Sequence, residues 1–328
     1  MAVIGITTTV PQEVIWASGN IPVDLNNVFV ASPLRESFLS RANRDGYPRT
    51  VCPWIAGIYG AVVETKSIDA LVVVTQGDCS NTHALAETLE DAGIDIIPFA
   101  YPYDGDQTLL RAEIEHFSEK LGATMDDILK WFYRLRKPRK LVSRMDEMTW
   151  RENLVTGREN HRWLVASSDF DGDIEAYSRE LSKFIDTATT RQPRENCLRL
   201  GYIGVPPIFP DIYDEVETLG ARIVFNETQR QFSLPFPDDD FIEAYAKYTY
   251  PASVFRRIED VRREIARREI HGIIHYTQSF CFRQIEDLLF RRHLDVPVLT
   301  LEGENSFEID ERTRVRLEAF IRMLEERL

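Results

Sequence analysis

The repeated alternation of short β-branched runs with longer helical patterns is the feature that most constrains the fold. In the first half, the sequence predicts strands at residues 3–6, 24–30, 70–75 and 95–98, and helices at residues 11–18, 53–66, 80–92 and 107–121. In the second half, it predicts strands at residues 198–203, 221–226, 272–277 and 296–301, again separated by helices. Such alternation builds βα units around parallel sheets. We therefore expect an α/β fold with two Rossmann- or flavodoxin-like parallel-sheet domains.

The middle of the chain carries helical patterns and no strand pattern. Apolar residues recur at helical spacing from Met125 to Leu135, and residues 173–187 form a second helical pattern. Residues 191–196 are polar and contain a proline, as linkers often do. These features predict an N-terminal domain at residues 1–123, a helical connector and linker at 124–196, and a C-terminal domain at 197–328. A last helix is expected from one apolar stripe, which consists of Leu317, Phe320, Ile321, Leu324 and Leu328.

Composition excludes several classes of function. The chain has 328 residues and a net charge of −14, and general nucleic-acid or anionic-membrane surfaces need a basic footprint instead. No apolar run approaches the roughly 20 residues of a membrane helix, and the first residues lack a signal-peptide pattern. We expect a cytoplasmic protein. Its four cysteines include no CxxC pair, and in a reducing cytosol they indicate metal binding or catalysis.

Three of the cysteines occupy the same kind of place. Cys79 and Cys281 each follow a predicted strand and precede a helical pattern, and Cys52 follows a turn-like stretch and precedes the helix predicted at 53–66. A thiol at a helix N-terminus faces unpaired backbone N–H groups and the positive end of the helix dipole. Both effects favour the thiolate. Three such thiolates could together bind a metal or an iron–sulfur cluster, and they would leave one coordination position open.

The topology indicates where these thiols would meet. Ligands in open α/β sheets bind beyond the carboxyl ends of the strands, so one shared metal centre would lie in the cleft between the two domains. Taken singly, each cysteine is also explained as a small buried hydrophobe, and Cys197, in the linker before a strand, is interpreted in that way.

Three neighbouring side chains are candidates for catalysis. His83 lies one helical turn after Cys79, where it could act as a hydrogen-bond donor or acid, or be a partly exposed helix histidine. Arg283 could attract an anionic substrate group or form a surface salt bridge. Glu302, with Glu304, could place a carboxylate in the same cleft or be a solvated loop charge.

The sequence lacks several common nucleotide-binding and hydrolase motifs, and their absence limits the reactions that we expect of the chain. The sequence has no GxxxxGK[ST] phosphate loop, no GxGxxG after a strand, no GxSxG and no HExxH. We therefore expect no ATP hydrolysis by a P-loop, no ordinary NAD site, no serine nucleophile elbow and no zincin-type hydrolysis.

Several motifs together resemble one known family. They are the segment from Val10 to Val23, Cys52-Pro53-Trp54, Gly77-Asp78-Cys79-Ser80, Cys281 after its strand, and a C-terminal pair formed by residues 299–304 and 312–320. Their order and spacing resemble the iron–sulfur component of the 2-hydroxyacyl-CoA dehydratase and benzoyl-CoA reductase family, particularly its D-component. The resemblance covers nearly the whole chain. The family usually has an aspartate at the position of Glu304.

The resemblance implies a [4Fe–4S] cluster held by Cys52, Cys79 and Cys281. It further implies radical dehydration or reduction of an acyl-CoA at the open iron, after a separate ATP-hydrolysing iron–sulfur activator has injected an electron. Such subunits act under anaerobic conditions with a paralogous subunit or a second copy as a dimer.

Other functions remain open from the sequence. The chain could be a non-catalytic electron-transfer or structural partner subunit, or it could reduce a small non-CoA substrate. A larger double-cubane cluster needs six cysteines, which three ligands per chain do not supply within one subunit. The plainest alternative is a two-domain binding protein with incidental cysteines.

Overall fold

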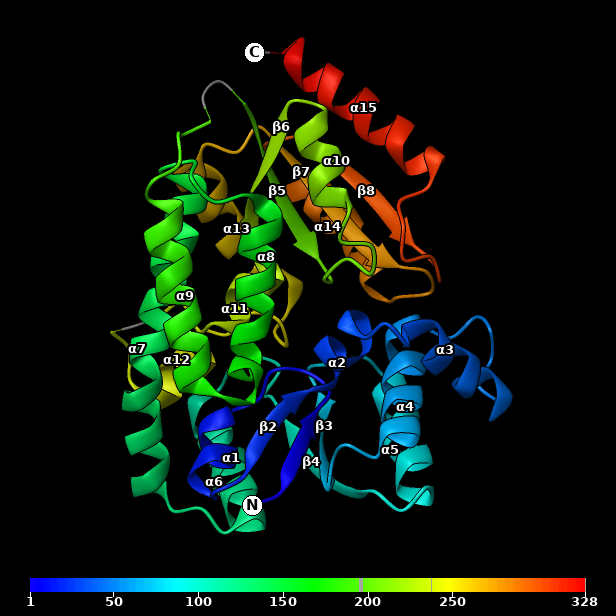
Figure 1. Ribbon diagram of the computed structural model, residues 1–328, viewed down its shortest axis with the longest axis vertical. Coiled ribbons are helices and arrows are strands. Elements are labelled where there is room, and N and C mark those ends of the chain that lie inside the picture. The colour runs from blue at the N-terminus through cyan, green and yellow to red at the C-terminus, as the bar shows by residue number, and fades with distance from the viewer. Residues whose placement is uncertain (195–196, 237, 328) are drawn as a thin grey trace. The chain divides into compact units, whose positions relative to one another are not determined.

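The computed structural model describes residues 1–194, 197–236 and 238–327 (Figure 1). The chain forms two compact units, and each is assembled from three segments. Unit 1 contains Met1–Lys140, Ala166–Tyr177 and Leu234–Ser253, and unit 2 contains Leu141–Val165, Ser178–Ser233 and Val254–Leu328. The segment 124–196, predicted as a helical connector, therefore contributes residues to both units.

Unit 1 is built on a parallel sheet whose strand order is β2-β1-β3-β4 within the described residues. The strands are β1 (Val3–Ile6), β2 (Ile21–Asp24), β3 (Ala70–Gln76) and β4 (Asp95–Ala100). Its helices are α1 (Gln12–Ala17), α2 (Leu25–Ala31), α3 (Arg35–Arg44), α4 (Pro53–Thr65), α5 (Asn81–Asp91), α6 (Gln107–Leu121) and α12 (Phe241–Ala246), with short turns η1 (Ala166–Ser168) and η2 (Phe170–Gly172).

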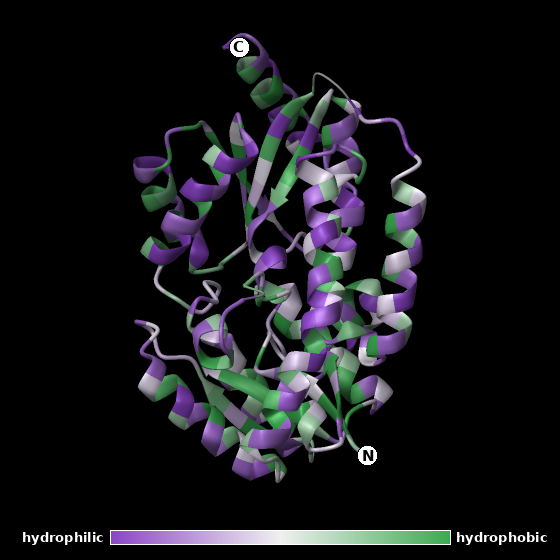
Figure 2. Cartoon of the chain, turned by 90° about the vertical axis from the view of Figure 1, so that its left-hand side faces the viewer, coloured by the Kyte–Doolittle hydropathy of each residue, from purple (hydrophilic) through white to green (hydrophobic). Residues whose placement is uncertain are grey.

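The central strand β3 is buried on both faces, as parallel sheets require. Leu71 and Val73 join the core formed with α4 and α5. Val72 and Val74 point to the opposite face, because successive side chains of a strand alternate, and both are buried. Figure 2 shows the resulting pattern, in which strands carry long hydrophobic stretches and helices show alternating hydrophobic and hydrophilic bands.

Unit 2 repeats this design with the strand order β6-β5-β7-β8, again parallel among the described residues. The strands are β5 (Leu198–Gly204), β6 (Ala221–Asn226), β7 (Gly272–Gln278) and β8 (Val298–Gly303). The helices are α8 (Gly157–Val165), α10 (Ile212–Thr218), α11 (Glu227–Phe232), α13 (Val254–Arg268), α14 (Arg283–His293) and α15 (Glu311–Glu325). Two further helices, α7 (Met125–Trp150) and α9 (Ile174–Ala188), have residues in both units.

Helices cover both faces of the second sheet. Ile273 packs with α13 and α14 in one core cluster. Its neighbour Gly272 faces the other side, where a Cβ atom would lie 2.7 Å from Leu324 of α15. The two parallel sheets with flanking helices confirm the predicted fold class.

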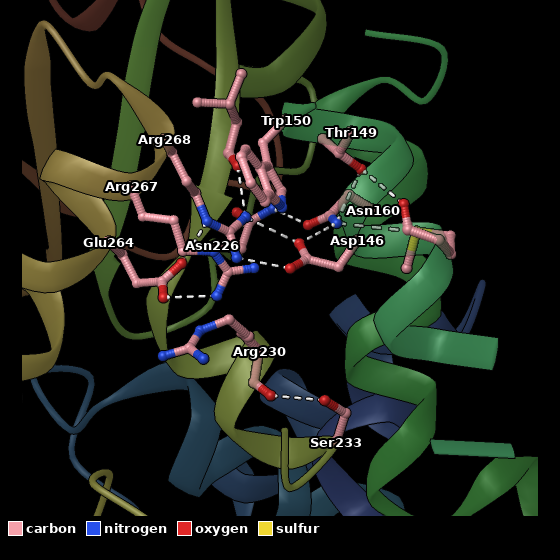
Figure 3. Close-up of polar contacts among 12 residues, drawn as sticks. Asp146, Thr149, Trp150, Asn160, Asn226, Arg230, Ser233, Glu264, Arg267 and Arg268 are labelled. Carbon is pink, nitrogen blue, oxygen red and sulfur yellow. Dashed lines mark hydrogen bonds and ion pairs between the residues drawn. The ribbon is translucent and has the colours of Figure 1, made fainter. Parts of the chain in front are cut away.

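A buried polar network joins α7, α8, β6 and α13 in unit 2 (Figure 3). Arg268 is fully buried, and its guanidinium donates to Asp146 at 3.0 and 2.6 Å and to Glu264 at 2.5 Å. Asn160 donates to Asp146 at 3.0 Å and accepts from Asn226 at 2.7 Å. Burial alone would raise the pKa of Asp146, but the Arg268 charge holds it below its usual range.

One predicted strand is wrong. The sequence predicts a strand over residues 24–30, whereas the strand is Ile21–Asp24 and a helix begins at Leu25. The Asp24 side chain accepts the Asn26 N–H at 2.9 Å, which caps and starts that helix. Pro22 lies within this strand and argues against a strand in the sequence, because proline cannot donate a ladder hydrogen bond. It is tolerated here because β2 lies at the edge of the sheet.

The remaining predicted strands agree with the structure to within two residues at each end. The stripe predicted for the last helix is buried at Leu317, Phe320, Ile321 and Leu324, whereas its fifth member, Leu328, lies outside the described residues. Residues 195 and 196 of the predicted linker also lie outside them.

None of the described helices has the length and apolar character needed to cross a membrane.

Candidate functional site

Cys79 and Cys281 occupy equivalent places in the two units. β3 ends at Gln76 and β7 ends at Gln278, and in both cases the cysteine comes three residues after the strand end. The following helices begin at Asn81 and Arg283, two residues after the cysteines. Because β3 and β7 are the third strands in their sheet orders, each thiol lies at the carboxyl edge of its own sheet.

The turns that carry these thiols have unusual backbones. Gly77 has a φ of +101° and Phe280 a φ of +63°, both in the left-handed region. A Cβ atom on Gly77 would lie 2.4 Å from the Pro251 Cβ, so glycine also allows the segment around Pro251 to pack on this turn. Asp78 accepts long hydrogen bonds from the hydroxyls of Tyr250 at 3.5 Å and Thr82 at 3.4 Å. The turn before Cys79 therefore packs against Tyr250 and Pro251 of its own unit.

Cys52 is the residue immediately before α4. It occupies the N-cap position with Pro53 in the first turn, and its carbonyl accepts the Ala56 N–H at 3.1 Å. The side chain packs partly buried against the core of unit 1. Cys52 thus has a helix N-terminus behind it, as Cys79 and Cys281 do.

The donor set fits an iron–sulfur cluster chemically. None of the three thiols is in a disulfide, and each is partly exposed. Cysteine thiolates are the usual ligands of such clusters. Two of the three belong to unit 1 and one to unit 2. Among the described residues, no group of three or more His, Cys, Asp or Glu side chains is arranged to hold a metal ion.

Cys281 departs from one expectation. The helix N-terminus was expected to favour its thiolate, but burial raises the pKa of the thiol. The Arg283 backbone N–H and the Arg283 charge oppose this rise without cancelling it. The thiol therefore stays protonated in the metal-free protein near neutral pH, and metal binding would release that proton.

Arg283 is buried rather than at the surface. It is the first residue of α14, its side chain is 5% exposed, and it pairs with Glu286 at 3.4 Å. Arg283 therefore does form a salt bridge, but the prediction that this salt bridge lies at the surface is wrong.

His83 and Glu302 are both exposed. The His83 Nε2 lies 2.9 Å from the Thr75 carbonyl oxygen, and since a carbonyl only accepts, the nitrogen donates. Glu302 lies within β8 opposite Thr277, whereas Glu304 follows the strand and its carbonyl accepts from Gln278 at 2.6 Å.

Cys197 lies at the other edge of its sheet. It precedes β5, which starts at Leu198, whereas Cys281 follows the end of β7. Because β5 and β7 are parallel, the two cysteines lie at opposite edges of the same sheet. Cys197 is therefore a natural control for any test of the other three.

Two residues that the sequence did not single out, Arg257 and Glu227, are linked through Glu286 to Arg283. Arg257 and Glu227 are buried and form a bidentate ion pair at 2.7 and 2.8 Å, and Arg257 also donates to Glu286 at 2.5 Å. They come from α13, α11 and α14, and no local sequence pattern links them.

Comparison with known families gives one match. The family model described as 2-hydroxyglutaryl-CoA dehydratase, D-component, matches residues 7–324. No curated protein matches the chain. The family match confirms the resemblance drawn from the sequence motifs.

Proposed function

The chain belongs to the 2-hydroxyglutaryl-CoA dehydratase D-component family, and on this basis we propose that it is the iron–sulfur component of a 2-hydroxyacyl-CoA dehydratase or related reductase. Membership of this family supports a role for the chain as one component of a dehydratase-type enzyme system. The finer proposal is a [4Fe–4S] cluster held by Cys52, Cys79 and Cys281. The observation that carries it is the strand–turn–cysteine–helix arrangement, which recurs at β3 and β7.

The proposed ligands come from both units. Three thiolates would leave one iron without a protein ligand. When bound, the cluster would supply a Lewis-acidic iron that polarises a thioester carbonyl and a one-electron couple for radical dehydration or reduction. The helix N-termini behind the three cysteines would offset the negative charge of the thiolates.

Three neighbouring groups have proposed roles toward the substrate. His83 already donates from Nε2 to the Thr75 carbonyl, so its ring is oriented at the start of α5, and a hydrogen bond donated to a substrate would come from Nδ1 of the doubly protonated ring. Arg283 brings a positive charge next to Cys281. Glu302 is an exposed carboxylate near the end of β8. We propose His83 as a donor or acid, Arg283 as an electrostatic stabiliser and Glu302 as a carboxylate facing the substrate.

The proposal requires partners. The family is named for a component, so the chain is proposed to work with a paralogous subunit or a second copy, and to take electrons from an ATP-hydrolysing iron–sulfur activator. The missing phosphate-loop motif agrees with ATP hydrolysis by another protein. We propose that the system works in a reducing, anaerobic cytoplasm.

Electron paramagnetic resonance tests this function. The protein is reconstituted anaerobically with iron and sulfide, reduced, and titrated with 2-hydroxyacyl-CoA thioesters of different chain length. The proposal predicts a signal that at least one thioester perturbs, while free coenzyme A leaves it unchanged. A cluster signal indifferent to every thioester would instead support an electron-transfer subunit or reduction of a small non-CoA substrate.

A further inference from the structure

Four charged side chains form a continuous buried chain at the carboxyl edge of the second sheet. It starts at Glu227, which accepts the Gly204 N–H at 3.0 Å where β5 ends. Arg257 connects Glu227 to Glu286, and Glu286 pairs with Arg283 at 3.4 Å. The chain thus leads from the end of β5 to the residue two positions after Cys281.

The four charged side chains of this chain are largely shielded from solvent. The side chains of Arg257 and Glu227 are 0% and 1% exposed, and those of Arg283 and Glu286 are 5% and 16% exposed. Buried ion pairs gain little net stability, and removing one partner is expensive. Two positive and two negative charges compensate one another here, so each charge is held in place by its neighbours.

The positive end of the chain lies next to the thiol. The Arg283 backbone N–H hydrogen-bonds Cys281, and the Arg283 charge acts on its sulfur, whereas Glu286 acts in the opposite direction. The other acid on this part of α14 is Asp287, whose carboxylate lies 2.9 Å from the His275 Nδ1 and accepts a hydrogen bond from the Arg291 Nε at 2.6 Å. The charges that face Cys281 from its own helix are therefore those of Arg283 and Glu286.

We infer that Arg283 and Glu286 act with opposite charges on Cys281 and so set the reduction potential of the metal centre that this thiol ligates, and that Glu227 and Arg257 are positioning residues that hold Glu286 in place. The inference rests on the proposed function. One electron from an external low-potential donor makes the centre more negative, so a fixed positive charge nearby favours the reduced form. A nearby carboxylate disfavours it.

Opposite charge changes should therefore shift the potential in opposite directions. Arg283→Gln removes the positive charge and lowers the midpoint potential, and Glu286→Gln removes the negative charge and raises it. Arg283→Lys keeps the charge and returns the potential toward that of the wild type. Arg292→Gln makes the same charge change on an exposed residue of α14, about 13 Å farther along the helix, and leaves the potential unchanged.

The measurement is an anaerobic redox titration of the reconstituted full-length protein, followed by electron paramagnetic resonance. Iron content and thermal unfolding of every variant are measured beside it. Shifts of opposite sign at full iron content support the inference. Equal potentials, or shifts of the same sign in both variants, overturn it. If wild type itself binds no iron, the proposed function fails instead, so the two failures are distinguishable.

Should Arg283→Gln fail to fold, the Glu286→Gln and Arg283→Lys variants still decide the matter. Glu286→Gln leaves the bidentate Arg257–Glu227 pair in place. A lower or unchanged potential in that variant contradicts the inference by itself.

Discussion

At the scale of single residues, two buried carboxyl groups in unit 1 link the chain after α8 to the end of β2. The Asp24 N–H donates to Asp169 at 2.7 Å, and Ser168 donates to the Asp24 carboxylate at 2.6 Å. Burial, followed by the nearby Asp24 carboxyl, raises the pKa of Asp169 to about 8. Burial also raises the pKa of Asp24. One of the two groups therefore keeps its proton near neutral pH.

This pair predicts a pH-dependent stability. In the unfolded chain Asp169 releases its proton near pH 4, so folding binds a proton between about pH 4 and 8, and stability falls as the pH rises through that window. His161 acts oppositely, because burial lowers its pKa to about 4, and its contribution rises with pH up to about 6.5. Between pH 6.5 and 8 the Asp169 effect dominates.

Urea unfolding at pH 6.5 and 8 measures the effect. The wild type should lose about 1–2 kcal/mol across this range, and Asp169→Asn should lose much less, because asparagine does not titrate. The quantity compared is the change in unfolding free energy between pH 6.5 and 8. The absolute values are not compared, because the amide group of the Asp169→Asn variant also replaces one of the two hydrogen-bond-accepting oxygens of Asp169, and this loss lowers the stability equally at both pH values. Parallel slopes in the two proteins would show that Asp169 is ionised in the folded state.

Gly77 allows a second prediction at this scale. Gly77→Ala should destabilise the protein by about 1–3 kcal/mol more than Gly93→Ala, because both positions have positive φ but only Gly77 is in contact with Pro251. At Gly93 a Cβ atom meets nothing within 4 Å. Unfolding free energies of the two variants provide the comparison, and equal losses would contradict the close packing on the Cys79 turn.

The places of the cysteines were predictable because they depend on local patterns. A strand, a turn and a helix follow one another within about ten residues at both Cys79 and Cys281, and the sequence contains that information. The Arg257–Glu227 ion pair was not predictable, because its partners are 30 residues apart and meet only through tertiary packing.

At the scale of elements, buried charges join helices to the sheet of unit 2. Asp146 of α7 and Glu264 of α13 both hold Arg268, which also donates to the Val224 carbonyl of β6 at 2.7 Å. This network ties the C-terminal part of α7 to the second sheet. The long α7 was only partly predicted, since Pro138 lies inside it and proline usually ends a helix.

Asp146→Ala should destabilise the protein by about 3–5 kcal/mol, because it leaves the buried Arg268 guanidinium without its bidentate partner. Glu318→Ala is the matched control on α15, where the ion pair with Arg322 is exposed and is worth less than about 1 kcal/mol. Thermal and chemical unfolding of both variants test the difference. A small loss for Asp146→Ala would mean that the network contributes little to stability.

At the scale of the whole molecule, the two units repeat one strand order but carry different ligand candidates. Both place a cysteine three residues after their third strand. Cys52 of unit 1 precedes α4, the helix that leads into β3, whereas the residue before α13, the helix that leads into β7, is Ser253. Under the proposal, this asymmetry gives three thiolate ligands instead of four and accounts for the open iron position.

The central claim is that one cluster draws ligands from both units, and iron and sulfide analysis tests it most directly. The wild type and the variants Cys79→Ala, Cys281→Ala and Cys197→Ala are reconstituted anaerobically in parallel. We expect about four irons per chain in the wild type and in Cys197→Ala, and a lost or labile cluster in the other two. An iron-free wild type, or a Cys281→Ala variant that holds its iron as firmly as Cys197→Ala does, would contradict the account.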